Sequence, residues 1–312
     1  MEPRKVIKFG NSSYVVTLPF EWVKSNNLDK SNSVYVTENK DCLILSLNKE
    51  NKAKHAEINI DDMPLKLFNR KLISYYLKNF KYIKISGENV IEKLEEIRVL
   101  KEKLSSIEIV EINQNYVMLK DLTSPNELNI SKIITEIVDM EKILFEELSN
   151  ETKKNKSYFI SSLDVNINKL SFLAYKAINY NLDVWQNPDY VRDAIHYHRI
   201  VSSFESIGDI LKRIARYLKD IDKEHTHHIS MQINALKEYF LFITNFLQQD
   251  INIENNLKLH LDKKQSALRE IENMRVKFNE DINLYLVISQ LLKDILGQLD
   301  TVLISVIDIN CK

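Results

Sequence analysis

The amino-acid sequence predicts an α+β protein that is mainly α-helical, with an N-terminal β module, a small α/β connector and tandem three-helix bundles. Two observations favour helices. The chain of 312 residues contains only four glycines and five prolines, so it is poor in the residues that make turns. From about residue 129 to the end, apolar residues recur at helical spacing. A third observation, the β-rich pattern of residues 5–47, predicts the N-terminal module.

The composition excludes several classes of protein. Hydrophobic residues make up 44% of the chain and charged residues 28%, as in an ordinary globular protein. The formal net charge of −1 gives no overall attraction to nucleic acids or membranes, so any DNA contact requires a local basic face. Cys42 and Cys311 have neither metal-binding nor redox spacing. No window approaches the roughly 18 apolar residues of a membrane span, and we expect a cytoplasmic protein without membrane insertion.

Residues 1–50 are predicted to form two hairpins around a short helix. Strand-forming residues occupy 5–9 and 14–18, and a turn-forming cluster separates them. A helix of about two turns is expected after Pro19, and a second hairpin at 34–37 and 42–47. A module of this size is marginal as a monomer, because its core is too small. We therefore expect a homodimer.

Residues 51–126 are predicted to form the α/β connector, and residues 127–312 the helical region. After a charged linker at 49–55, the connector pattern predicts helices at 65–77 and 91–104 and strands at 82–85, 107–110 and 116–119. The helical region should contain six helices, near 130–150, 157–182, 189–221, 225–250, 253–278 and 280–308.

A repeat of glycine positions divides the six helices into two groups. Gly208 and Gly297 each fall inside the third helix of a group of three, where glycine costs about 1 kcal/mol relative to alanine. Two tandem three-helix bundles, with a close helix contact at each glycine, account for both positions.

The N-terminal motif resembles a known DNA-binding family. The runs KFGNSSYVVTLPFEWV at 8–23 and LDKSNSVYV at 28–36 are similar to the AbrB/MazE/SpoVT family of swapped-hairpin proteins, over about residues 3–47. The resemblance implies that the hairpins of two chains interleave and that basic residues near the start face DNA. The DNA-contacting residues that we expect are Arg4, Lys5, Lys8, Asn11, Ser12, Ser13 and Lys24.

The charge of this segment agrees with a modest DNA-binding face. Four basic residues among the first 24 outnumber Glu2 and Glu21, which leaves a net charge of +2 per chain. Such a face would make a few salt-sensitive phosphate contacts, and the polar residues of the turn could bond to phosphates or base edges. The alternative is a dimerisation module that does not bind DNA.

The helical region resembles PhoU, a regulator of phosphate signalling built of two three-helix bundles. The run FESIGDILKRIA at 204–215 is similar to the signature of that family. Together with the N-terminal motif, it resembles archaeal phosphate uptake regulators. This resemblance implies a DNA-binding transcriptional regulator of phosphate homeostasis. The alternative is an accessory protein that regulates a phosphate transporter by contact with its ATPase subunit, without binding DNA.

The resemblance also implies a metal site. Acidic E-x-x-x-D pairs of the PhoU family can hold divalent or iron-type metal ions, and Glu205 and Asp209 retain this pair. In the second bundle the corresponding residues are Asp294 and Gln298, so we expect a weaker site there. Helical geometry places Glu205 and Asp209 on one stripe, away from the apolar face. The alternative is a solvated charged face whose carboxylates are offset by nearby Lys212 and Arg213.

No motif in the sequence indicates catalysis. The histidines at 225, 227 and 228 fall in a predicted turn, and we expect them to be exposed loop residues. The chain has no phosphate-binding glycine loop and no nucleophile motif, because its four glycines are isolated. We expect no enzyme activity and no catalytic residue. A metal-dependent helical enzyme is the rival hypothesis, but its ligand set is incomplete.

Overall fold

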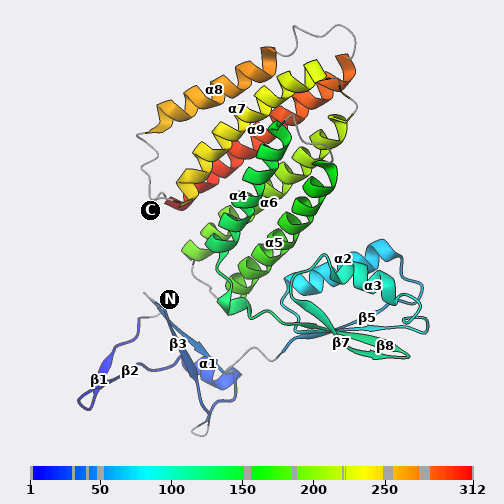
Figure 1. Ribbon diagram of the computed structural model, residues 1–312. Coiled ribbons are helices and arrows are strands. Elements are labelled where there is room, and N and C mark those ends of the chain that lie inside the picture. Colours follow the sequence, from blue (N-terminus) through cyan, green and yellow to red (C-terminus); the bar gives the residue numbers. More distant parts are fainter. Residues whose placement is uncertain are drawn as a thin grey trace. The chain divides into compact units, whose positions relative to one another are not determined.

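Figure 1 shows the computed structural model, which describes residues 3–29, 32–39, 42–47, 53–150, 156–184, 188–219, 221, 223–248, 256–273 and 282–310. These residues are mainly helical and include small sheets, as the sequence predicts. The chain divides into two compact units, an N-terminal unit at Met1–Ala53 and a C-terminal unit at Lys54–Lys312. None of the described helices is long and apolar enough to cross a membrane.

The N-terminal unit contains two hairpins on either side of one short helix. Strand β1 pairs antiparallel with β2, and β3 pairs antiparallel with β4. Gly10, with a φ of 67°, lies in the first turn and adopts the left-handed conformation that glycine allows without strain. The elements are β1 (Ile7–Phe9), β2 (Ser13–Val15), α1 (Phe20–Ser25), β3 (Tyr35–Asn39) and β4 (Cys42–Ser46).

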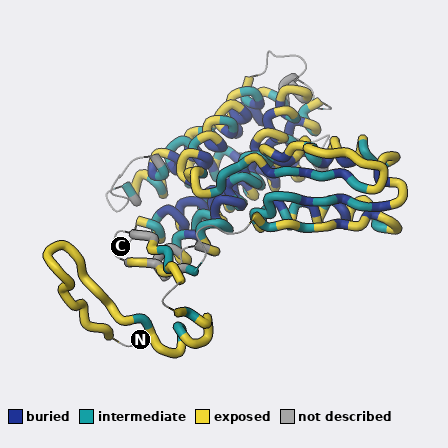
Figure 2. The backbone as a smooth tube through the Cα atoms, turned by 90° about the horizontal axis from the view of Figure 1, so that it is seen from below, coloured by how far each residue is buried: buried dark blue, intermediate teal, exposed yellow. Residues whose placement is uncertain are grey.

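Within one chain, the described part of this unit hardly buries its apolar side chains. Helix α1 buries none of its residues. Val6, Phe9 and Phe20 are 65%, 71% and 72% exposed, and Figure 2 draws most of the described unit as exposed. Because burial of apolar surface is the main driving force of folding, this unit has much unburied apolar surface to offer a partner.

The C-terminal unit begins with a four-stranded sheet of order β5-β6-β8-β7. Strands β5 and β6 are parallel, and β8 pairs antiparallel with β6 and β7. Two helices, α2 and α3, follow the parallel strands and cover one face of the sheet (Figure 1). The elements are β5 (His55–Asn59), α2 (Leu65–Leu77), β6 (Tyr82–Ser86), α3 (Leu94–Lys101), β7 (Ile107–Asn113) and β8 (Tyr116–Asp121), followed by a 3₁₀ turn, η1 (Pro125–Glu127).

Strand β5 differs from the sequence-based expectation, which places a linker up to His55 and no strand before the first connector helix. Its buried side chain, Ile58, alternates with the exposed polar residues Glu57 and Asn59. One buried isoleucine in a short polar segment is a weak signal, and the strand depends on its pairing with β6.

All six helices of the predicted helical region are present, and most ends lie within a few residues of the expected positions. They are α4 (Ile130–Ser149), α5 (Lys156–Val184), α6 (Pro188–Tyr217), α7 (Lys223–Gln248), α8 (Leu257–Asn273) and α9 (Ile282–Asn310). One correction concerns the histidines at 225, 227 and 228. They lie in the first turns of α7 and not in a turn between helices, because the apolar pattern that includes Ile229 and Ile233 extends the helix toward its start.

The helices pack in two trios. Helices α4, α5 and α6 contact one another, and so do α7, α8 and α9. Packing of α4 on α7 and of α6 on α9 joins the trios into one hydrophobic core. The apolar face predicted for α6 is buried as expected; its residues are Val201, Phe204, Ile207, Leu211 and Ala215.

The two helical glycines have different surroundings. A Cβ atom on Gly208 would lie 3.2 Å from Oε1 of Glu141 and 3.5 Å from Ile167, so the close contact predicted there is present. Among the described residues, none would lie within 4 Å of a Cβ atom on Gly297. The predicted close contact at Gly297 is therefore wrong, because this residue lies on the exposed side of α9.

Helix α5 connects the helical trios to the sheet. Lys176 forms an ion pair with Asp121 at the end of β8. One turn later the side-chain amide of Asn179 donates to the backbone oxygen of Leu77, at 3.0 Å. Asp183 then forms an ion pair with Lys54, at 3.1 Å. These contacts recur at helical spacing, so one face of α5 lies against the sheet and α2.

Candidate functional site

The seven residues expected to contact DNA all lie exposed in the N-terminal unit. Lys8 is in β1, opposite Tyr14 of β2. Asn11 and Ser12 form the turn, and Ser13 begins β2. The first hairpin thus groups one lysine with the polar turn residues at its tip. Lys24 lies in the last turn of α1, while Arg4 and Lys5 precede β1.

The residues expected to bind metal are not all brought together. Glu205 is half-buried on α6, and Asp209 lies one turn further on the exposed side. Asp294, on α9, is exposed and accepts a hydrogen bond from Gln290 Nε2 at 2.8 Å. Among the described residues, Asp294 does not join Glu205 and Asp209 in a group that could hold one metal ion.

Two further carboxyl groups lie near the α6 pair and were missed in the sequence. Asp164, on α5, is buried and forms an ion pair with Lys212 of α6. Glu141, on α4, is fully buried beside Gly208. Neither of its carboxyl oxygens has a hydrogen-bond partner of good geometry within the described part of the chain. We call Glu141, Asp164, Glu205 and Asp209 the carboxyl cluster of the first trio.

The surroundings of Glu205 add two aromatic rings to this cluster. The hydroxyl of Tyr175 on α5 donates a hydrogen bond to Oε2 of Glu205 at 3.0 Å. The ring of Tyr175 lies against that of His198, with 4.7 Å between the centroids. Burial, followed by the charge of Glu205, raises the pKa of the Tyr175 hydroxyl, so this hydroxyl stays a donor at neutral pH.

Glu141, Glu205 and Asp209 have raised pKa values, and burial is the largest cause in each case. Burial holds the pKa of Glu141 well above its usual range. The backbone of Gly208 lowers this pKa, whereas the charges of Asp164 and Asp209 raise it further. Burial also raises the pKa of Glu205, and the charges of Asp209 and Asp164 add to that shift. Burial and the charge of Asp164 raise the pKa of Asp209, and the charge of Lys212 opposes the shift. The cluster therefore favours bound protons or a compensating cation.

A different polar network lies in the second trio, away from Asp294. The hydroxyl of Tyr239 on α7 donates to Oδ1 of Asp300 on α9, at 3.0 Å, and lies 3.2 Å from Nδ1 of His260 on α8. Lys264 of α8 forms an ion pair with Asp300, at 2.6 Å. Burial lowers the pKa of His260, and the charge of Asp300 opposes this shift. These contacts hold α8 on α7 and α9.

One sequence signal could have located Glu141 and Asp164. Both stand within apolar helical stripes, at positions where the pattern calls for a core residue. The network around Tyr239 has a weaker signal, because its members come from three helices that are distant in sequence.

In the described residues, no three histidine, cysteine, aspartate or glutamate side chains are arranged to hold one metal ion.

The chain was also compared with known proteins. It matches no protein-family model, no curated protein and no solved structure.

Proposed function

We propose that the chain is a homodimeric, DNA-binding transcriptional regulator of phosphate uptake. A swapped-hairpin module would precede the connector and a PhoU-like pair of three-helix bundles, and the protein would act in the cytoplasm. The connection to phosphate rests on the resemblance of residues 204–215 to PhoU. The observation that best supports the proposal is the N-terminal unit, where exposed apolar residues accompany an exposed set of basic and polar residues.

The exposed apolar residues support dimerisation through this unit. In a single chain, Phe9, Phe20 and Leu43 leave between 66% and 72% of their surface in water. Interleaving the hairpins of two chains would bury them, and a symmetric dimer needs only one self-complementary surface. We expect the N-terminal unit expressed alone to sediment as a dimer at micromolar concentration. A folded monomer would contradict the swapped-hairpin proposal.

The DNA-binding proposal is tested by mobility shift with full-length protein on genomic fragments at two salt concentrations. Alanine at Arg4, Lys5 and Lys8 together should abolish binding, and each single change should lower the salt slope by roughly one per lost phosphate contact. Asn11→Ala should change sequence preference. The matched control is alanine at Lys66, Arg70 and Lys71, which are exposed on α2; this variant should bind normally.

The second candidate function is regulation of a phosphate transporter ATPase subunit without DNA contact. Exposed apolar residues on two adjacent helices support it, since Ile195 of α6 and Ile304 of α9 are 51% and 54% exposed. This function predicts that the ATPase subunit copurifies with the protein and that an Ile195→Asp/Ile304→Asp variant no longer binds the subunit. It also predicts that alanine at Arg4, Lys5 and Lys8 leaves both subunit binding and regulation normal. If all three results are found, this function replaces the first.

A divalent or iron-type metal ion is proposed only for the first trio. Glu205 and Asp209 could supply two oxygen ligands one turn apart, and water would complete the coordination shell. The buried carboxyl group of Glu141, which has no hydrogen-bond partner of good geometry among the described residues, supports a compensating cation nearby. The hydroxyl of Tyr175 already bonds to Glu205, and Lys212 already pairs with Asp164. Such a site would therefore be open and weak. Exposed Asp294 would contribute little.

A further inference from the structure

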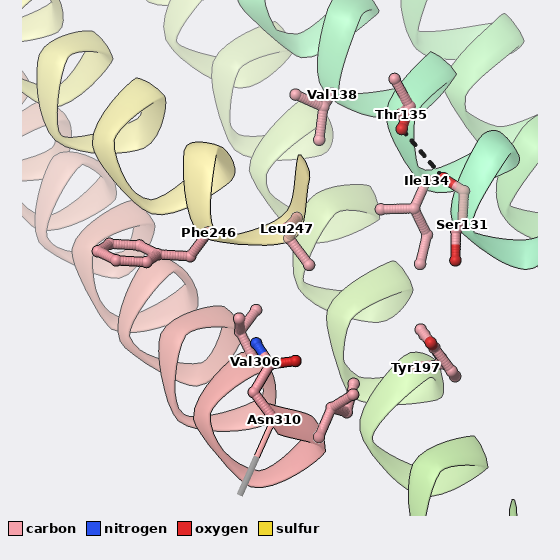
Figure 3. Close-up of a pocket in the computed structure, with 10 residues that line it drawn as sticks. Ser131, Ile134, Thr135, Val138, Tyr197, Phe246, Leu247, Val306 and Asn310 are labelled. Atoms are coloured by element: carbon pink, nitrogen blue, oxygen red, sulfur yellow. Dashed lines mark hydrogen bonds between the residues drawn. The ribbon is translucent and has the colours of Figure 1, made fainter. Parts of the chain in front are cut away.

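A small cavity opens between helices of both trios. Side chains from α4 and α6 of the first trio and from α7 and α9 of the second line it. Its volume is about 100 Å³. In Figure 3, Ile134 and Val138 lie on one side of the opening, and Phe246 and Val306 lie on the other. These four side chains are buried, so the inner wall of the cavity is apolar.

The outer wall is polar but uncharged. It includes Ser131, Thr135, Tyr197 and Asn310. The Thr135 hydroxyl donates to the backbone oxygen of Ser131 at 3.1 Å (Figure 3). Among the described residues, none forms a hydrogen bond with the Tyr197 hydroxyl, which can therefore both donate and accept. An apolar wall with a hydroxyl at its edge fits a ligand that has one apolar and one polar end.

The lining also limits the charge and size of a ligand. None of the described lining residues is charged, and an ion without a partner is costly to bury. Phosphate is therefore a poor ligand for this cavity. An apolar cavity of roughly 150 Å³ accommodates benzene, so a volume of about 100 Å³ suits a compact ligand, provided that its polar end lies at the opening.

We propose that this cavity binds a small uncharged molecule with a compact ring or branched body and one hydroxyl group, such as a phenol or a short alcohol. The hydroxyl end lies at Tyr197, and the apolar end lies between Val138, Phe246 and Val306. Because the ligand contacts both trios, binding stabilises the packing of α4 on α7 and of α6 on α9. This inference does not depend on the proposed regulatory function.

The test is a titration of full-length, methyl-labelled protein with phenol, followed by NMR. The methyl signals of Ile134, Val138 and Val306 should shift and saturate, while those of Ile85 in the sheet stay constant. Benzoate, which has a similar ring but a negative charge, should cause no shift at the same concentrations. Tyr197→Phe preserves the shape of the wall, and we expect it to weaken phenol binding about fivefold.

A second variant, Val306→Phe, fills the cavity and should abolish the phenol-dependent shifts of Ile134 and Val138. The proposal is overturned if no cavity methyl responds to millimolar phenol, or if benzoate binds as tightly as phenol. Unchanged phenol affinity in Tyr197→Phe also overturns it, because the hydroxyl would then play no part.

Discussion

The ammonium group of Lys176 on α5 and the carboxylate of Asp121 on β8 form an ion pair in which the side chains are 0% and 3% exposed. The ammonium group also lies 4.6 Å from the ring centroid of Tyr76. Asp121 accepts two further hydrogen bonds from Thr123. Burial, followed by the charge of Lys81, lowers the pKa of Lys176 to about 7. The carboxylate therefore stabilises an ammonium group that its surroundings otherwise disfavour.

Removing the carboxylate charge should destabilise the C-terminal unit strongly. We expect Asp121→Asn to lower the free energy of unfolding by about 3 kcal/mol, because a buried charge loses its partner. The control is Asp183→Asn, which breaks the exposed pair with Lys54 at the same junction and should cost about 0.5 kcal/mol or less. Urea unfolding measures both. Equal losses would show that burial of the Lys176 pair has no energetic importance.

The buried Glu141 should make stability depend on pH. Its pKa is raised on folding, so the folded state retains a proton that the unfolded chain releases above its ordinary pKa, near 4.5. Its contribution is therefore fully present below that pH and is lost as the pH rises toward the folded-state pKa. Glu141→Gln should flatten the decline in unfolding free energy above pH 5.

The control for this prediction is Glu136→Gln, at an exposed position of the same helix. It should leave the pH dependence of wild type unchanged. Unfolding by urea at several pH values between 5 and 8 distinguishes the two variants. If Glu141→Gln and wild type had parallel profiles, the carboxyl group of Glu141 would not be protonated on folding.

The two helical glycines should respond oppositely to alanine. Gly297→Ala should raise the free energy of unfolding by roughly 0.5–1 kcal/mol, since alanine favours helix and its Cβ would meet none of the described residues within 4 Å. Gly208→Ala should lower it, because the new Cβ presses on Glu141 Oε1 inside a closely packed core. Thermal unfolding of the two variants compares them directly. A gain of stability in both would mean that Glu141 moves aside freely.

Metal content should distinguish the two trios. Glu205→Gln with Asp209→Asn removes both proposed oxygen ligands and should abolish any bound metal, whereas Asp294→Asn should change the metal content little. Elemental analysis after identical purification measures this difference. Equal loss in the two variants would contradict the asymmetry. Absence of metal from the wild type would leave Glu205 and Asp209 as polar groups of a helix face.

Local patterns in the sequence were sufficient to predict most of the helices and their buried faces. The stripe from Val201 to Ala215 follows the helical period, and each of the positions predicted to be apolar and inward-facing is buried. The close contact at Gly208 was also predictable, because glycine inside a helix is costly without a packing reason. The same argument failed at Gly297, since a single residue type does not reveal which side of the helix faces its neighbours.

The parts that were missed depend on contacts between distant segments. Strand β5 becomes a strand through pairing with β6, some 27 residues later in the register. The carboxyl cluster combines Glu141, Asp164 and the α6 pair from three helices, and helical periodicity describes one helix at a time. The residues expected to bind DNA are a different case. The structure shows that they are exposed, but their role rests on the resemblance to the AbrB/MazE/SpoVT family.

The contacts along one face of α5 have a consequence for how the C-terminal unit unfolds. Lys176, Asn179 and Asp183 attach this helix to the sheet and to α2, and the hydrophobic side chain of Phe172 packs against the sheet's core. Separating the sheet from the helices would expose a buried ion pair and part of two cores at once. The backbone amides of β8 and of the second half of α5 should therefore exchange with solvent in the same opening event, as one cooperative folding unit.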